Sequence, residues 1–297
     1  MSFAQVLSVV SSSSKLAELS KAKEQKKDEQ LHNFSRIAGL QVAKDTILET
    51  MEAPFKYSYL YKELPIKMPK GVLLYGPSGV GKTYLANAVK EQVRISFFEF
   101  KGSDILNMYI GASEQAVRDI FETAMSVAPS VVFFDEFESI VPKRTANNTG
   151  VTDRIVNQFL CYLDGVSSLE GVFLMAASSR PEMIDPALLR PGRIDKHVYL
   201  DYPNEQERAE LLTIYQHAIS FEYPTEDIVS KTVNYSYSDM VGLLKELRIK
   251  KAGVLLKQEK YEKSDFKFIS KDFFDSIQKG YRLSSTPQQQ AMQRRRY

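Results

Sequence analysis

Residues 76–83 of the chain read Gly-Pro-Ser-Gly-Val-Gly-Lys-Thr, directly after the apolar run Gly-Val-Leu-Leu-Tyr at 71–75. The run is typical of a buried strand, and the residues after it are expected to open a helix. Glycines at such a junction let the backbone curl around a phosphate chain with its N–H groups pointing inward. The helix N-terminus adds partial positive charge. The stretch therefore predicts a phosphate-binding loop rather than an accidental glycine-rich turn.

Two side chains of this loop have the chemistry of a nucleoside triphosphate site. Lys82 is expected to reach the β- and γ-phosphates, and the Thr83 hydroxyl is expected to bind Mg²⁺. The residues expected to contact the nucleotide here are Gly76, Pro77, Ser78, Gly79, Val80, Gly81, Lys82, Thr83 and Tyr84.

Four further apolar runs, rich in β-branched and aromatic residues, lie at 95–100, 131–136, 172–179 and 197–202. The run at 131–134 is apolar at every position, as expected for a strand that is covered on both faces. Helical patterns separate the first four runs. This alternation predicts an α/β fold, with a five-stranded parallel sheet flanked by helices and joined by right-handed crossovers.

Changes in composition along the chain divide it into four parts. Residues 1–33 are mostly polar and charge-dense, which predicts a linker or N-terminal extension. Residues 34–203 contain all the strand-like runs and form the predicted large domain. Helical patterns then fill 204–283, the predicted small helical domain, and residues 284–297 form a polar tail.

Composition argues against several classes of protein. The net charge is +2 over 297 residues, so no strong field favours nucleic acid or an anionic surface. The single Cys161 cannot form an internal disulfide, and the three histidines lie far apart without cysteine partners for zinc. No apolar run approaches the ~20 residues of a membrane span, and the N-terminal apolar patch lacks the preceding basic residue of a secretory signal.

A second acidic motif follows the run at 131–134. Asp135 is placed to hold Mg²⁺ at the end of a buried strand, and Glu136 is placed to act as general base for an attacking water. The alternative is that the two carboxylates simply face solvent beyond the end of a strand, and the pair alone would be a weak signal. Because the pair follows a buried strand about fifty residues after the phosphate loop, it predicts a site for hydrolysis of the triphosphate.

A third motif contains two arginines three positions apart. Arg190 and Arg193 lie in the stretch 185–193, Asp-Pro-Ala-Leu-Leu-Arg-Pro-Gly-Arg, which is too rich in proline and glycine for a long helix. Surface salt bridges are the usual role of such arginines. The functional alternative is an arginine finger that acts on the γ-phosphate of a neighbouring subunit.

These three motifs, in this order and spacing, resemble the AAA-type ATPases of the Cdc48-like group over residues 34–283. In finer detail, residues 109–118, 135–144 and 148–154 are similar to the second AAA domain of the peroxin-one family of peroxisome-biogenesis ATPases. The resemblance implies a P-loop NTPase fold of the AAA type with a helical lid, ATP and Mg²⁺ as cofactors, and a hexameric ring that threads protein through a central pore.

The resemblance also implies roles for individual positions. Ser179 matches the first sensor of the γ-phosphate, where peroxin-one proteins also have serine. Arg190 and Arg193 match the two fingers, and Leu163-Asp164-Gly165 matches a segment that signals between subunits. The positions that match contacts to adenine are Ile37, Ala38, Gly39, Tyr237 and Ser238.

Two loops match the pore loops of the family. Tyr109 matches the aromatic residue of the first loop, where a ring can grip an extended backbone by packing alone. Ile110 adds apolar contact and Gly111 lets the loop turn. Residues 144–152 match the second pore loop. The alternatives are that Tyr109 belongs to the core and that 144–152 is an idle surface loop.

The implied partners are a related ATPase of the peroxin-six type in the ring, a protein substrate in the pore and the peroxisomal membrane, reached through an adaptor. No nucleic acid is expected. The implied location is cytoplasmic and peripheral at that membrane, and the implied work is extraction of import receptors during matrix protein import.

Three features depart from the family pattern. Met108 stands where a basic residue often precedes the pore aromatic. Tyr237-Ser238-Asp239 stands where the lid usually has Gly-Ala-Asp, so the tyrosine is expected to crowd the adenine or stack on it. Peroxin-one proteins have two ATPase domains after N-terminal domains, whereas this chain has room for one.

Two other functions therefore stay open at this point. The chain could be an ATP-binding structural subunit of a ring with little turnover, which the departure at Tyr237 favours and the intact Lys82, Asp135 and Glu136 oppose. It could also be a related motor with another substrate, such as membrane-fusion complexes.

Overall fold

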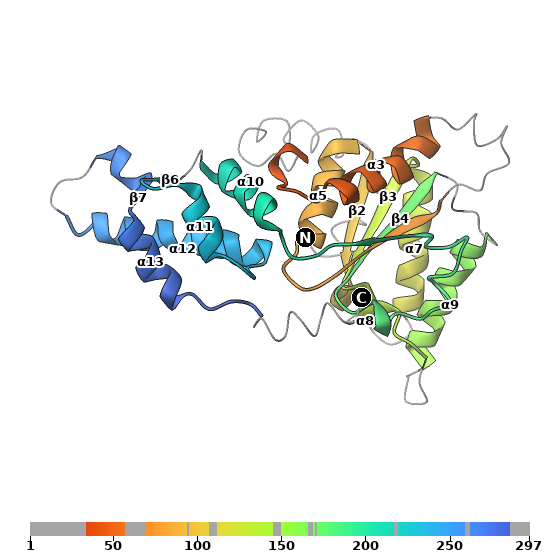
Figure 1. The fold of residues 1–297 in the computed structure, drawn as a ribbon. Coiled ribbons are helices and arrows are strands. Elements are labelled where there is room, and N and C mark those ends of the chain that lie inside the picture. Colours follow the sequence, from red (N-terminus) through yellow and green to blue (C-terminus); the bar gives the residue numbers. More distant parts are fainter. Residues whose placement is uncertain are drawn as a thin grey trace.

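A parallel five-stranded sheet with the order β2-β3-β4-β1-β5 lies at the centre of the larger part of the molecule (Figure 1). The structure is a computed structural model that describes residues 34–56, 69–93, 95–106, 112–144, 150–165, 169, 171–216, 219–258 and 262–285. The strands are β1 (Gly71–Tyr75), β2 (Ser96–Lys101), β3 (Ser130–Asp135), β4 (Val172–Ser178) and β5 (Lys196–Tyr199). The predicted α/β fold and its five strands are confirmed.

Alternation along the strands builds two cores, one on each face of the sheet. Leu73 and Phe134 pack on the face covered by α7 (Ala112–Ser126) and α9 (Gly150–Asp164). Leu74 and Phe133 pack on the opposite face, under α3 (Gln41–Lys56) and α5 (Lys82–Val93). Because both faces are covered, the middle strands are apolar at successive positions, which explains the unbroken run at 131–134.

Short elements connect this framework. They are η1 (Phe34–Arg36), α6 (Gly102–Leu106), α8 (Phe137–Ile140) and η2 (Pro181–Met183). The register pairs Tyr75 at the end of β1 with Ser178 at the end of β4, and β3 lies on the other side of β4. The phosphate loop, Asp135 and Ser179 therefore leave the sheet at the same edge.

The chain after Pro203 forms a second, mainly helical unit with its own core beside the sheet (Figure 1). Its helices are α10 (Glu205–Gln216), α11 (Thr225–Lys231), α12 (Tyr237–Leu255), η3 (Lys263–Phe266) and α13 (Lys271–Gly280). The expectation that strands stop at Pro203 is wrong in one detail, because β6 (Ser220–Phe221) pairs in parallel with β7 (Phe268–Ile269). Strands of two residues are too short to show alternation.

The N-terminus of α12 is held by one buried carboxylate. Asp239 is 2% exposed and accepts hydrogen bonds from Ser236 N–H at 3.0 Å and Ser236 Oγ at 2.7 Å, while its own N–H donates to Ser236 Oγ. It also accepts from Ser284 N–H at 2.8 Å and Ser284 Oγ at 3.1 Å. This capping box ties the start of α12 to the chain beyond α13.

We expect Asp239→Ala to lower the free energy of unfolding by about 2–3 kcal/mol, because it removes the cap and leaves buried N–H groups unpaired. Urea unfolding measures the change. Asp45→Ala, at an exposed position on α3, is the control and should stay within about 0.5 kcal/mol. Equal effects of the two substitutions would contradict this role of Asp239.

Candidate active site

The loop at 76–81 has a backbone that requires its glycines. Gly79 and Gly81 have φ values of +82° and +92°, in the left-handed region that side chains rarely adopt. At Gly76, a Cβ atom would collide with the carbonyl oxygen of Leu200. The sequence therefore fixes a loop whose backbone can wrap an anion, between β1 and the first turn of α5.

Lys82 supplies a buried positive charge to this loop. Its Nζ donates to the carbonyl oxygens of Gly76 at 2.8 Å and Pro77 at 2.7 Å, and the residue is only 7% exposed. Burial lowers the pKa of Lys82 to about 8, although the carboxylates of Glu138 and Asp135 partly oppose this shift. A phosphate chain in the loop would add opposite charge next to this ammonium and favour its protonated form.

Thr83 and Asp135 meet where a metal ion is expected. Thr83 Oγ1 donates to Asp135 Oδ2 at 2.7 Å, joining the first turn of α5 to the end of β3. Both are hard oxygen ligands of the kind that Mg²⁺ prefers. Within the described residues no cluster of three or more His, Cys, Asp or Glu could hold a metal. The hydroxyl and the carboxylate fit an Mg²⁺ whose other ligands would be phosphate and water oxygens.

Glu136 follows directly and has a strained backbone. Its φ and ψ are 52° and 45°, a left-handed conformation that costs a residue with a side chain about 1–3 kcal/mol. Phe137 holds the chain in this conformation, since it is fully buried against Phe134 and Phe159 with ring centroids 5.9 and 5.5 Å away. Glu136 itself is exposed, so its carboxylate is available at the edge of the sheet.

A third carboxylate, which the sequence analysis did not single out, lies beside this site. Glu138 is 7% exposed, and its Oε1 accepts from the N–H of Ser179 at 3.4 Å and lies 3.9 Å from Arg180 Nε. It is also close enough to Lys82 to influence the pKa of that ammonium. An acidic residue between buried Phe137 and Ile140 was the available signal. Glu138 thus contacts the backbone of the predicted sensor, and its charge influences the lysine.

The two arginines of the third motif have different surroundings. Arg193 Nε and Nη2 donate to Asp164 Oδ1 and Oδ2 at 2.6 and 2.8 Å, and its Nη1 donates to the Ala187 carbonyl. Arg190 is exposed. None of the described contacts of either arginine is with residues 76–83, Asp135 or Glu136, so a role at the phosphates of the same subunit has no support.

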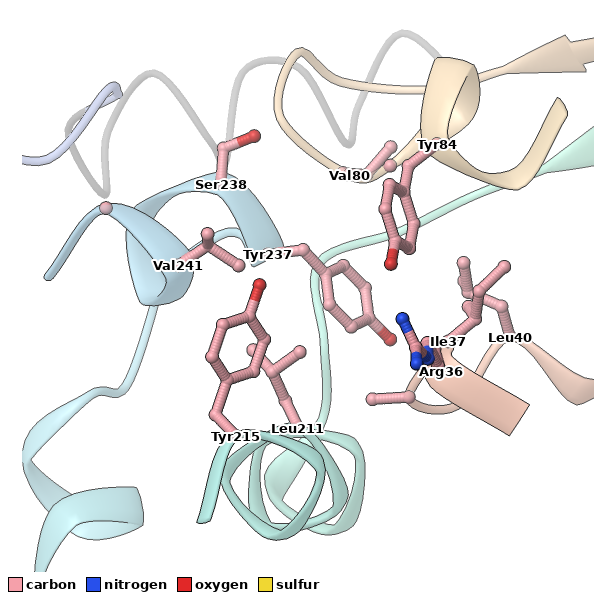
Figure 2. Close-up of a pocket in the computed structure, with 13 residues that line it drawn as sticks. Arg36, Ile37, Leu40, Val80, Tyr84, Leu211, Tyr215, Tyr237, Ser238 and Val241 are labelled. Atoms are coloured by element: carbon pink, nitrogen blue, oxygen red, sulfur yellow. The ribbon is translucent and has the colours of Figure 1, made fainter. Parts of the chain in front are cut away.

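An apolar cavity of about 370 Å³ lies beside the phosphate loop, between the sheet domain and the helical unit (Figure 2). Tyr237 forms part of its wall, between Tyr84 from the sheet domain and Leu211 from α10 (Figure 2). The volume suits a nucleobase with its sugar. Of the positions predicted to contact adenine, Ile37, Ala38, Tyr237 and Ser238 line the cavity, and Gly39 is not among its lining residues. Val80, Gly81 and Tyr84, predicted as nucleotide contacts of the phosphate loop, line it as well.

Hydrogen bonds join the two sides of this cavity. The N–H groups of Gly39 and Leu40 donate to the carboxylates of Glu210 at 2.7 Å and Glu207 at 3.1 Å, on α10. Across the cavity, Ser238 N–H donates to the carbonyl oxygen of Gly79 at 3.0 Å. A nucleotide bound here would contact both units, so its loss would loosen their junction.

The Tyr237 hydroxyl is a polar group within this mostly apolar wall. It is buried, and the Glu207 carboxylate lies close to it without a hydrogen bond of normal geometry. Burial raises the pKa of Tyr237, and the nearby carboxylates of Glu207 and Glu210 raise it further, so the hydroxyl keeps its proton. A base in the cavity would offer acceptors to this donor.

We expect Tyr237→Phe to weaken ATP binding about 5-fold, the loss of one hydrogen bond, without lowering stability in the absence of nucleotide. Titration calorimetry measures the affinity. Tyr223→Phe is the matched control, because the Tyr223 hydroxyl is also buried without a described partner but lies outside this cavity. An unchanged affinity in Tyr237→Phe would show that the base does not use this hydroxyl.

The predicted pore contacts Met108, Tyr109, Ile110 and Gly111 lie outside the described residues, as do residues 145–149 of the predicted second pore loop. Arg144, at the edge of the second loop, is described. Its Nε donates to Asp185 at 3.0 Å and its Nη2 donates to Asn157 at 3.0 Å.

Comparison with known proteins gives consistent relatives. The family described as "ATPase family associated with various cellular activities (AAA)" matches residues 72–202. The chain is 46% identical over 224 residues to "Peroxisomal ATPase pex1" of Schizosaccharomyces pombe, covering 75% of this chain and 24% of that protein. It is 46% identical over 213 residues to "Peroxisomal ATPase PEX1" of Homo sapiens, covering 71% of this chain and 17% of that protein. The chain thus spans a quarter or less of these relatives.

Proposed function

The chain carries a domain of the AAA family of ATPases, and on that premise we propose that it is a motor subunit that hydrolyses ATP to move protein substrates. The observation that carries this proposal is the hydrogen bond of 2.7 Å between Thr83 and Asp135. Lys82 directly precedes Thr83 in the chain, and Glu136 directly follows Asp135. These are the parts that phosphoryl transfer to water requires.

Each part has a separate task in the proposed reaction. The loop at 76–81 and Lys82 bind the phosphates, and the wall formed by Tyr237 and Ile37 binds the base. Mg²⁺ held by Thr83 and Asp135 would neutralise charge on the β- and γ-phosphates. Glu136 accepts a proton from the water that attacks the γ-phosphate. Ser179, at the end of β4, senses that phosphate.

The site is completed by a neighbouring subunit in this proposal. Arg190 is exposed and has no described contact with its own phosphate loop, as expected for a finger that acts across an interface. A hexameric ring provides six such interfaces and a central pore. Tyr109 and its neighbours at 108–111 would grip the substrate in that pore.

The names of the relatives support a cellular role for this motor. They are peroxisomal ATPases, so we assign the chain to matrix protein import into peroxisomes, where it extracts receptors from the membrane. A peroxin-six-like ATPase would share the ring, and an adaptor would connect it to the membrane from the cytoplasmic side. Among the described helices, none has the length and apolar character to cross a membrane.

A module exchange tests the proposed function in cells. Residues of this chain replace the 224 aligned residues of the fission yeast relative, and import of a fluorescent matrix marker is scored in cells that lack that relative. We expect import with the exchanged module and none with the same module carrying Glu136→Gln. Equal import by both chimaeras, or failure of an ATP-hydrolysing chimaera to support any import, would overturn the assignment.

A further inference from the structure

The second arginine of the pair, Arg193, is held inside its own subunit. Its guanidinium makes two parallel hydrogen bonds to the Asp164 carboxylate, at 2.6 and 2.8 Å, and a third to the Ala187 carbonyl oxygen. The Arg193 side chain is 18% exposed. Paired, charge-assisted bonds of this kind fix both the position and the plane of a guanidinium. Nε, Nη1 and Nη2 are all occupied, so Arg193 has little freedom to reach another subunit.

The backbone between the two arginines is a rigid turn. The N–H of Arg193 donates to the carbonyl oxygen of Arg190 at 3.2 Å, which closes a four-residue turn with Pro191 and Gly192 in the middle. Gly192 has φ +89°, as the third position of a type II turn requires, and proline is favoured at the second. The last residue of the turn is therefore anchored to Asp164, while the first residue, Arg190, is exposed.

Asp164 connects this turn to a long helix, because it is the last residue of α9. Its hydrogen bonds with Arg193 lower the pKa of the Asp164 carboxyl, so the pair stays ionised at neutral pH. The four-residue turn at 190–193, here called the finger turn, is thus joined to the end of α9 by this ion pair.

We propose that Asp164 and Arg193 are a positioning pair within one subunit, which sets the turn so that Arg190 alone reaches the γ-phosphate of the neighbouring subunit. This inference rests on the proposed function, because it concerns the same interface site. It assigns different work to two arginines that the sequence motif presents as equivalent: Arg190 touches the substrate, and Arg193 acts through Asp164.

A double-mutant cycle on the assembled protein tests the pair. Asp164→Asn and Arg193→Gln are each expected to lower kcat about 10- to 100-fold, the effect of a misplaced catalytic group, with little change in ATP affinity. The double variant should be no slower than the slower single variant, because both remove the same bond. Glu114→Gln with Arg118→Gln, an exposed pair at 3.8 Å on α7, is the matched control and should leave kcat unchanged.

Two results would overturn the inference. Near-normal kcat in Asp164→Asn with a large loss in Arg193→Gln would mean that Arg193 contacts the phosphate itself, and multiplied losses in the double variant would mean that the two residues act separately. Urea unfolding checks that each variant is folded. Wild-type turnover in the same assay distinguishes failure of the proposed function from failure of this inference. If the wild-type protein does not hydrolyse ATP, both are wrong. If it does, and the losses of kcat in the two single variants are independent, only this inference is wrong.

Discussion

Glu136→Gln is expected to lower ATP turnover by about 10³-fold while the protein continues to bind ATP with Mg²⁺. The amide has nearly the same shape as the carboxylate but cannot accept a proton from the attacking water, and general bases typically contribute 10²- to 10⁴-fold. Because Glu136 is exposed and its backbone is fixed by Phe137, the fold should tolerate the change. Turnover is measured by phosphate release and binding by calorimetry.

The control for this prediction is Glu122→Gln, an exposed carboxylate on α7, which should hydrolyse ATP at the wild-type rate. Turnover retained in Glu136→Gln would mean that another group activates the water. Glu138 would then be the residue to test, since its carboxylate accepts from the Ser179 N–H and influences the pKa of Lys82.

Arg190→Ala is expected to lower kcat by about 10³- to 10⁵-fold, the usual contribution of an arginine finger to phosphoryl transfer. ATP affinity should change much less, since the finger acts mainly on charge that develops in the transition state. The exposed position of Arg190 predicts no loss of stability.

A mixing experiment shows whether Arg190 acts across an interface. Glu136→Gln and Arg190→Ala subunits are each inactive alone, but in a mixed ring some sites combine Glu136 of one subunit with Arg190 of its neighbour. In a random equal mixture about a quarter of the sites are complete, so turnover should return to about that fraction. A mixture that stays inactive although mixed rings form would place Arg190 within its own subunit's site.

The sequence was sufficient for the fold of the sheet domain and for its resemblance to AAA ATPases, whose family model matches residues 72–202. Both rest on local patterns, since the glycine-rich loop and the apolar run at 131–134 need neighbours only a few residues away. The two relatives compared above are peroxisomal ATPases, as the resemblance implied. Strand ends were less predictable: β5 ends at Tyr199, although Leu200 is also buried.

Contacts between distant parts of the chain could not be predicted. Asp164 and Arg193 are 29 residues apart and meet only because α9 ends beside the finger turn. Glu138 belongs to the site because its carboxylate accepts from the N–H of Ser179, which is 41 residues away in the chain. Hydrophobic periodicity carries no information on such pairs. The sequence motifs therefore gave two equivalent arginines and two carboxylates at the site. The structure distinguishes the two arginines and adds Glu138 as a third carboxylate.

The central claim is that ATP is hydrolysed at sites shared between subunits. Its most direct test is ATP turnover per subunit, measured from low to high protein concentration, with and without a peroxin-six-like ATPase. The account predicts that turnover per subunit rises as rings assemble and that Glu136→Gln abolishes it at every concentration. Turnover per subunit that is constant from the lowest concentration upward, or ATP binding in assembled rings without hydrolysis, would contradict it.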